Sequence, residues 1–171
     1  MKGIIIYQGR YGATNQYAHW LADALHVPLL RVESATTAML AGYDVVILGS
    51  SVYVGNLLIA KWLDRNAGAL AEKKVFLFIV CGTTADDTAQ QQQIIRNNLG
   101  KALSRSVSWF FLPGKCVISG LSWKDRFILK MGAWLEKDPK KKAAMQQGFN
   151  HMDRKKLDPL IAAVERSQIE I

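Results

Sequence analysis

The chain has 171 residues, half of them apolar, and a formal net charge of +8 at pH 7. This length fits a single domain over residues 1–171, and the composition predicts a folded globule. No apolar run reaches the ~18–20 residues of a membrane span, and the N-terminus lacks a cleavable signal pattern. Two cysteines, Cys81 and Cys116, exclude a disulfide framework and lack metal-ligand spacing, so we expect buried thiols in a reducing cytoplasm.

Short β-branched runs alternate with segments of helical periodicity through the first two thirds of the chain. The predicted strands are Lys2–Tyr7, Val27–Val32, Asp44–Leu48, Val75–Val80 and Val107–Leu112. Helices are predicted over residues 15–25, 57–66 and 87–103, and Thr14 is expected to cap the first of them. This alternation predicts an α/β protein whose parallel sheet has right-handed crossovers and helices on both faces.

Residues 115–171 differ from the rest because they hold twelve Lys and Arg against seven Asp and Glu. Here we expect a helix from about Trp123, a basic turn around Pro139 and a final helix from about Leu157. Such a positive balance suits an anionic partner, whether nucleic acid, lipid or an acidic protein.

The loops that follow the first, third and fourth strands should carry the chemistry, because ligands of open α/β sheets lie beyond the carboxyl ends of the strands. The first loop, Gln8–Asn15, combines glycines with a helix start, which favours an anion such as phosphate. It matches neither the dinucleotide nor the nucleoside-triphosphate motif. A tight turn capped by Thr14 would explain this loop equally well.

The second loop, Gly49–Asn56, places Tyr53 among small residues, where its flat face could stack on a planar ring. The alternative is a rim residue that packs on the next helix. The third loop, Cys81–Asp86, offers backbone groups and hydroxyls to the polar edge of such a ring, or is a plain turn and helix cap.

Three segments together resemble the flavodoxin-like family, which includes menaquinone-dependent protoporphyrinogen dehydrogenases. They are Gly12-x-Thr14, the run Tyr43–Gly55, and Trp123-x-Asp125-Arg126-Phe127. The resemblance covers nearly the whole chain. It implies a flavodoxin-like three-layer sandwich with a five-stranded parallel sheet in the order 2-1-3-4-5. It also implies non-covalent FMN and redox chemistry, with oxidation of protoporphyrinogen in heme biosynthesis as its most concrete form.

The resemblance also implies cofactor-binding residues, carried over by position. The phosphate would meet Gly9, Arg10, Tyr11, Gly12, Ala13 and Thr14. The isoalloxazine ring would be bordered by Ser51, Val52, Tyr53, Val54 and Gly55, and the third loop would contribute Cys81, Gly82, Thr83 and Thr84 at its pyrimidine edge. We assign no catalytic acid or base and no metal ligand, because the flavin carries the electron chemistry.

Two features differ from ordinary flavodoxins. Only Thr14 keeps a hydroxyl among the phosphate-loop positions that usually hold Ser or Thr, and the chain is basic where ordinary flavodoxins are acidic. The alternative function is therefore a binding or adaptor module with a degenerate flavin site, which acts through its basic C-terminal surface.

An apolar stripe runs along the helix predicted from Trp123, with Arg126 and Lys130 beside it and Lys124 interrupting it. Its members are Trp123, Phe127, Ile128, Met131, Trp134 and Leu135. The simpler interpretation is a helix packed on the domain. The other is peripheral contact with the inner face of the membrane, or with another redox protein, through residues 123–142. We expect a redox protein or a quinone as partner and no nucleic acid, because the tryptophans do not alternate with the basic residues.

Overall fold

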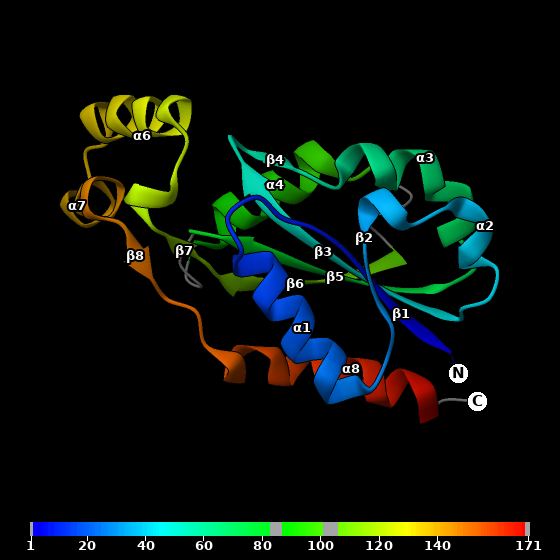
Figure 1. Ribbon diagram of the computed structural model, residues 1–171. Helices are drawn as coiled ribbons and strands as arrows, with labels where there is room; N and C mark the ends of the chain where they lie inside the picture. Colours follow the sequence, from blue (N-terminus) through cyan, green and yellow to red (C-terminus); the bar gives the residue numbers. More distant parts are fainter. Residues whose placement is uncertain (1, 83–86, 101–105, 170–171) are drawn as a thin grey trace.

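The computed structural model describes residues 2–82, 87–100 and 106–169. Five parallel strands form the main sheet in the order β2-β1-β3-β5-β6 (Figure 1). Their bounds are β1 Gly3–Gln8, β2 Leu29–Arg31, β3 Val45–Tyr53, β5 Lys74–Cys81 and β6 Val107–Pro113. The predicted order 2-1-3-4-5 is confirmed, since the additional strand β4, Asn56–Leu57, only pairs antiparallel with the end of β3.

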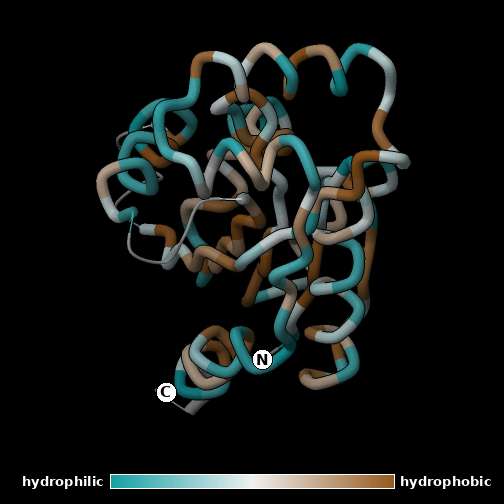
Figure 2. Tube along the Cα trace, turned by 90° about the vertical axis from the view of Figure 1, so that its left-hand side faces the viewer, coloured by the Kyte–Doolittle hydropathy of each residue, from teal (hydrophilic) through white to brown (hydrophobic). Residues whose placement is uncertain are grey.

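Helices cover both faces of this sheet (Figure 1). One apolar cluster joins the sheet to α1 (Ala13–Leu25) and α8 (Asp158–Ile169), and the other joins it to α3 (Ala60–Leu70) and α4 (Thr88–Asn98). Strand β1 contributes residues to both clusters, because Ile4 and Ile6 point to one face of the sheet and Ile5 points to the other. In Figure 2 the helices carry both hydrophobic (brown) and hydrophilic (teal) positions along their length.

Shorter elements complete the described chain. Helix α2 covers Thr37–Leu40, and 3-10 turns cover Val32–Ser34, Ile118–Gly120 and Arg154–Leu157. Beyond β6, a two-stranded ribbon of β7 (Lys115–Cys116) and β8 (Phe149–Asn150) leads into and out of helices α6 (Trp123–Leu135) and α7 (Pro139–Gln147). These two helices project from the body beyond the carboxyl ends of the strands (Figure 1).

Several local predictions need correction. Thr14 does not cap α1, because Gly12 occupies the cap position and Thr14 lies inside the first turn. The predicted turn at Pro139 is the start of α7, because proline fits the first turn of a helix. The predicted helix over 57–66 starts only at Ala60, and Leu57 belongs to β4. Cys116 is half-buried, whereas Cys81 is buried as expected.

The second predicted loop is mostly strand. Strand β3 continues to Tyr53 because β5 pairs with it as far as Ser51, and a hairpin then returns the chain along β4. The two central residues of the turn, Val54 and Gly55, have φ of 48° and 77°, as a two-residue hairpin requires. A β-branched residue rarely adopts a positive φ, so Val54 gives no sequence signal for this turn.

Replacing Tyr17 with phenylalanine is expected to lower the free energy of unfolding by about 1 kcal/mol. The Tyr17 hydroxyl donates to the Pro113 carbonyl (2.9 Å) and accepts from the Asp153 N–H (3.1 Å), so it ties α1 to the end of β6 and to the C-terminal segment. Urea denaturation of both proteins measures the difference. A loss below a few tenths of a kcal/mol would show that water replaces both contacts.

The difference in unfolding free energy between the wild type and Tyr17→Phe should also depend on pH. Desolvation by burial raises the pKa of Tyr17 above its ordinary value of 10.0. A raised pKa means that the protonated hydroxyl is the form favoured by folding, so its contribution is complete below pH 10 and is lost as the pH rises through the folded-state pKa. The wild type should therefore lose more stability above pH 10 than Tyr17→Phe does.

Candidate functional site

A cavity of about 110 Å³ lies at the carboxyl ends of the parallel strands. It is lined by all three predicted loops and by the ribbon that follows β6: Arg10, Tyr11, Ala13, Thr14, Ser51, Val52, Tyr53, Val80, Cys81, Gly82, Gly114, Lys115 and Phe149. The chain thus brings segments from residues 10 to 149 to one site, at the place where open α/β sheets bind their ligands.

The first loop is shaped by two glycines. A Cβ at Gly9 would lie 2.7 Å from the Thr14 Cβ, so the loop can fold back on α1 only with glycine there. Gly12 has φ of +86°, a left-handed conformation that starts α1, and its carbonyl accepts the Gln16 N–H at 3.0 Å. The N–H groups of the first turn have no partner inside the helix, and their dipoles favour an anion at this end.

Two buried hydroxyls in the cavity wall have no partner in the described part of the chain. They are the Thr14 Oγ1, on a residue only 1% exposed, and the Ser51 Oγ. Buried polar atoms are nearly always hydrogen-bonded, because an unmatched one costs about 1–3 kcal/mol. Two unmatched hydroxyls beside a helix N-terminus therefore indicate a polar or anionic ligand.

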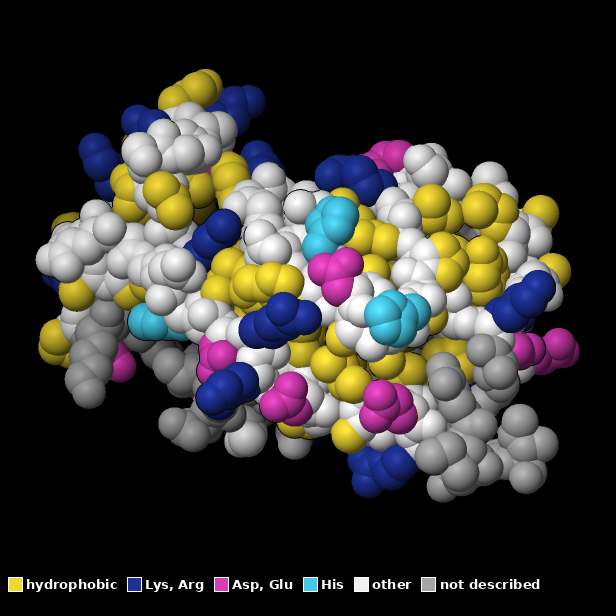
Figure 3. Space-filling view, turned by 60° about the horizontal axis from the view of Figure 1, so that its bottom comes forward, with side chains coloured by type: hydrophobic (Ala, Val, Ile, Leu, Met, Phe, Trp, Pro, Cys, Tyr) yellow, Lys and Arg dark blue, Asp and Glu magenta, His cyan; other side chains and the backbone are white. Residues whose placement is uncertain are grey.

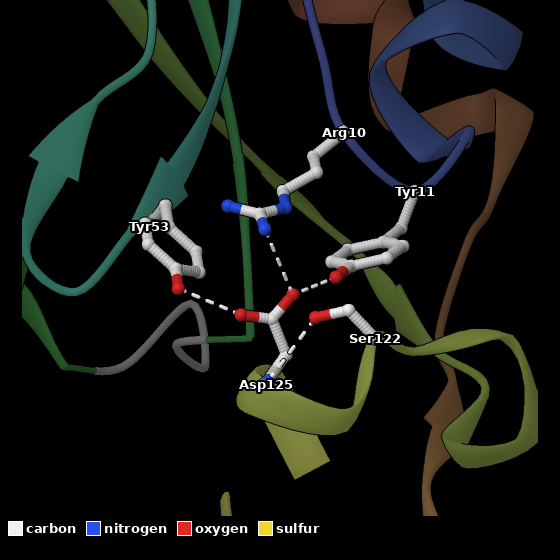
Figure 4. Close-up of polar contacts among 5 residues, drawn as sticks. All are labelled: Arg10, Tyr11, Tyr53, Ser122 and Asp125. Carbon is white, nitrogen blue, oxygen red and sulfur yellow. Dashed lines mark hydrogen bonds and ion pairs between the residues drawn. The ribbon is translucent and has the colours of Figure 1, made fainter. Parts of the chain in front are cut away.

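The mouth of the cavity is closed by three side chains that surround one carboxylate (Figure 4). Asp125 accepts hydrogen bonds from the Tyr53 hydroxyl (2.6 Å) and from the Tyr11 hydroxyl, and it forms an ion pair with Arg10 (3.1 Å between Nη2 and Oδ2). We call these four residues, Arg10, Tyr11, Tyr53 and Asp125, the closing cluster. It connects the first loop, the end of β3 and helix α6.

The start of α6 holds Asp125 in place. The Ser122 hydroxyl caps this helix by accepting the Asp125 N–H at 3.2 Å, and the Asp125 side chain is turned inward and buried. Arg10 is drawn between the two tyrosines, with its Cζ 4.4 Å from the centroid of the Tyr53 ring and 5.6 Å from that of Tyr11. The guanidinium therefore covers one face of Tyr53, the residue predicted to stack on a planar ring, and Asp125 offsets its charge.

The residues around the cavity are chemically complementary to FMN, but the cavity volume is too small for the whole cofactor. The helix N-terminus and the free hydroxyls suit a phosphate and hydroxyl-rich chain, and Tyr53 and Tyr11 suit a planar ring. Pockets for small-molecule ligands have volumes of about 300–1,000 Å³. The cavity of about 110 Å³ can hold a phosphate-sized group, so a complete flavin requires the closing cluster to separate.

The predicted site residues fall into four groups. Nine line the cavity: Arg10, Tyr11, Ala13, Thr14, Ser51, Val52, Tyr53, Cys81 and Gly82. Gly9 and Gly12 shape the first loop, and Val54 and Gly55 form the exposed hairpin turn. Thr83 and Thr84 lie outside the described residues.

Sequence reasoning missed the contribution of the C-terminal third. Phe149 packs against Gly82, where an added Cβ would lie 3.0 Å from its Cζ, and Gly114 and Lys115 enter the wall from the β6–β7 corner. Asp125 belongs to a quoted family segment but was given no role. The available signal was that Asp125 is the only acid in the basic, aromatic stretch Trp123–Leu135 and follows a capping serine.

Among the described residues, His, Cys, Asp and Glu form no group of three or more that could hold a metal ion. Within the same ranges, none of the helices is long and apolar enough to cross a bilayer.

Residues 4–143 match the family model of the flavodoxin domain. Among solved structures, the chain is similar to oxidised Flavodoxin 2 from Bacillus cereus, with 24% identity and a TM-score of 0.50 over 66% of this chain and 84% of that one. It is also similar to a flavodoxin, WrbA-like protein from Agrobacterium tumefaciens, with 14% identity and a TM-score of 0.50 over 66% and 82% of the two chains. Both similarities concern the fold. No curated protein matches the chain.

Proposed function

The chain belongs to the flavodoxin domain family, and from that premise we propose that it binds FMN non-covalently in the cavity and works as a redox protein. FMN would supply the exchange of one or two electrons, and the protein would supply binding, orientation and electrostatics. The observation that carries the proposal is a pair of buried hydroxyls in the cavity wall, Thr14 in the first turn of α1 and Ser51 on β3, which have no hydrogen-bond partner among the described residues.

Each part of the cofactor has complementary residues in the cavity. The N–H groups at the start of α1 and the Thr14 hydroxyl would hold the phosphate, and Arg10 adds a positive charge. Tyr53 and Tyr11 would face the ring, and Cys81 and Gly82 would meet its polar side. Apart from Tyr11, which the resemblance places at the phosphate, these assignments follow the family resemblance residue by residue.

A binding or adaptor module with a degenerate site is the competing function. In a degenerate site we would expect apolar side chains to replace the polar ones or to fill the cavity, because unmatched buried hydroxyls are costly. Thr14 and Ser51 remain polar and have no partner among the described residues, and no side chain fills the cavity beside them. This favours a retained ligand site.

We propose a quinone as the electron acceptor, in line with the resemblance to menaquinone-dependent protoporphyrinogen dehydrogenases. Support comes from α6, which carries Asp125 of the closing cluster and also exposes large apolar side chains such as Trp123 and Phe127. A lipid-soluble acceptor suits such surroundings better than a small soluble one. Oxidation of protoporphyrinogen remains a proposal on the resemblance alone.

The purified protein is expected to be yellow and to release FMN, not FAD, because the first loop leads directly into α1 and has no second Gly-rich stretch for a pyrophosphate. Heat extraction followed by chromatography identifies the flavin. The matched variant Thr14→Val keeps the side-chain shape and removes the hydroxyl, so it should bind FMN more weakly. Recovery of FAD, or of no flavin after reconstitution with FMN, would contradict the site assignment.

A further inference from the structure

Helix α6 exposes its apolar stripe, so the interpretation that this stripe packs on the domain is wrong. Its side chains and their exposed fractions are Trp123 (75%), Phe127 (61%), Ile128 (44%), Met131 (46%), Trp134 (75%) and Leu135 (66%). The face of α6 that is buried instead contains small or polar residues, Asp125 and Ala133, and Gly132 faces Met145 of α7. Single exposed apolar residues are ordinary, but six on a helix of 13 residues indicate an interaction surface.

The charges around this apolar face are mostly positive. Lys124, Arg126, Lys130 and Lys137 are exposed on or beside α6, and the acids beside its C-terminal end are the half-buried Glu136 and the exposed Asp138. The only acid within the helix, Asp125, is turned inward, where Arg10 pairs with it. The outward face of α6 is therefore apolar and cationic. Figure 3 shows hydrophobic and basic side chains together on the lobe that α6 and α7 form.

We propose that this face of α6 docks in the interfacial region of an anionic lipid bilayer. Tryptophans near both ends of the helix suit the headgroup level of a membrane, and the aliphatic residues between them suit the acyl boundary. At about 1.5 Å per residue the helix is ~20 Å long, which fits a position parallel to the surface. The exposed lysines complement anionic headgroups, each strengthening binding about fivefold.

Charge also argues against a second copy of the chain as the occupant. Two α6 faces in a symmetric contact would place the same cationic surface on both sides of the interface. With a net charge of +8 on each chain, such a contact would be opposed by electrostatic repulsion. The same positive charges are attracted electrostatically to an anionic surface.

The docking surface is connected to the candidate site through one residue. Asp125 leaves α6 on the side opposite the exposed stripe and binds Tyr11, Tyr53 and Arg10 at the cavity mouth. A membrane-bound α6 would hold that mouth close to the bilayer, where lipid-soluble electron carriers dissolve. This consequence rests on the proposed function, whereas the docking itself does not.

Vesicle co-sedimentation of the full chain tests the docking. We expect binding to phosphatidylcholine vesicles that contain 30% phosphatidylglycerol, with at least ~tenfold weaker binding to pure phosphatidylcholine and weaker binding in high salt. Because sedimentation does not depend on flavin, a protein without FMN that still binds vesicles would refute the proposed function alone. Equal binding to both vesicle types, or none to either, would overturn the docking proposal.

Matched variants locate the surface. Trp123→Ser with Trp134→Ser should weaken binding to the anionic vesicles at least ~tenfold, because the side chains with the largest exposed apolar area are lost. Trp109→Ser, which removes a 39%-exposed tryptophan of the edge strand β6, should leave binding unchanged. Circular dichroism establishes that each variant folds. If the double variant binds as well as the wild type, or if it only converts a wild-type dimer into a monomer, the lipid proposal is wrong.

Discussion

Tyr53→Ala is expected to weaken FMN binding by about 1–3 kcal/mol, because a stacked aromatic ring contributes a large buried contact. The structure places the Tyr53 ring in the cavity wall, beside Ser51 and Val52. Its outer edge is fixed by the hydrogen bond to Asp125, and one ring face is covered by the Arg10 guanidinium. A flavin ring could use that face only if Arg10 moves away from it. Fluorescence titration of the apoprotein with FMN measures the affinity.

Tyr53→Phe separates stacking from closure. Phenylalanine keeps the ring and loses only the hydroxyl that binds Asp125. We expect an FMN affinity within about 1 kcal/mol of the wild type, since one net hydrogen bond contributes about 0.5–1.5 kcal/mol and the closing cluster must open in any case. The rates of FMN association and release should both rise. An unchanged affinity for Tyr53→Ala would remove this residue from the ring site and leave Tyr11 as the aromatic contact.

The sheet was predictable from the sequence because its signals are local. Runs such as Gly3–Gln8 are buried on both faces, so they read as continuous apolar strands and set the alternation that fixes the fold class. The positions of the three loops follow from that alternation, since parallel strands all end at the same edge. This explains why nine of the proposed site residues line a single cavity.

The missing features are the ones that depend on distant contacts. Asp125 lies 114 residues from Tyr11 in the sequence, and its local signal, a single acid in a basic and aromatic stretch, does not indicate which distant segment its carboxylate contacts. The exposure of the α6 stripe could not be predicted from the sequence either, because apolar residues have the same spacing whether they face a core or a membrane. Only the placement of Ala133 and Asp125 on the buried face of α6 distinguishes the two.

The ion pair between Arg10 and Asp125 reduces the positive charge that Arg10 would otherwise present to the cofactor. A basic chain with Arg10 in the phosphate loop suggests a site of positive potential. In the structure the Asp125 carboxylate lies 3.1 Å from the guanidinium, so the pair carries almost no net charge at the cavity mouth. More distant lysines are screened by salt over about 8–10 Å. Lys115, which also lines the cavity, adds a positive charge of its own. The two members of the pair act on the local field with opposite signs, so substituting either one should shift that field in a defined direction.

Arg10→Glu is expected to weaken FMN binding by about 2–4 kcal/mol and to lower the reduction potential of the bound flavin. The substitution changes the local charge by two units and leaves two carboxylates beside a phosphate that carries about −1.5 to −2 at neutral pH. Each unit charge a few ångströms away contributes about 1–4 kcal/mol at effective dielectric constants of about 80 to 20. Reduction adds negative charge to the flavin, so the same carboxylates disfavour the reduced form.

Asp125→Asn is the matched substitution, and it should have the opposite effect. Asparagine keeps the size of the side chain and an oxygen that can accept from Tyr53, but it removes the negative charge and leaves Arg10 unopposed at the cavity mouth. We expect FMN to bind about 1 kcal/mol more tightly and the reduction potential to rise. FMN titrations and redox titrations of both variants at low and high salt measure the two signs. If both substitutions weaken FMN binding, Asp125 acts by positioning Arg10, Tyr11 and Tyr53, and the electrostatic explanation fails. If opposite shifts persist in high salt, the charges act at close range inside the closing cluster, because salt would have screened a contribution from the distant basic surface.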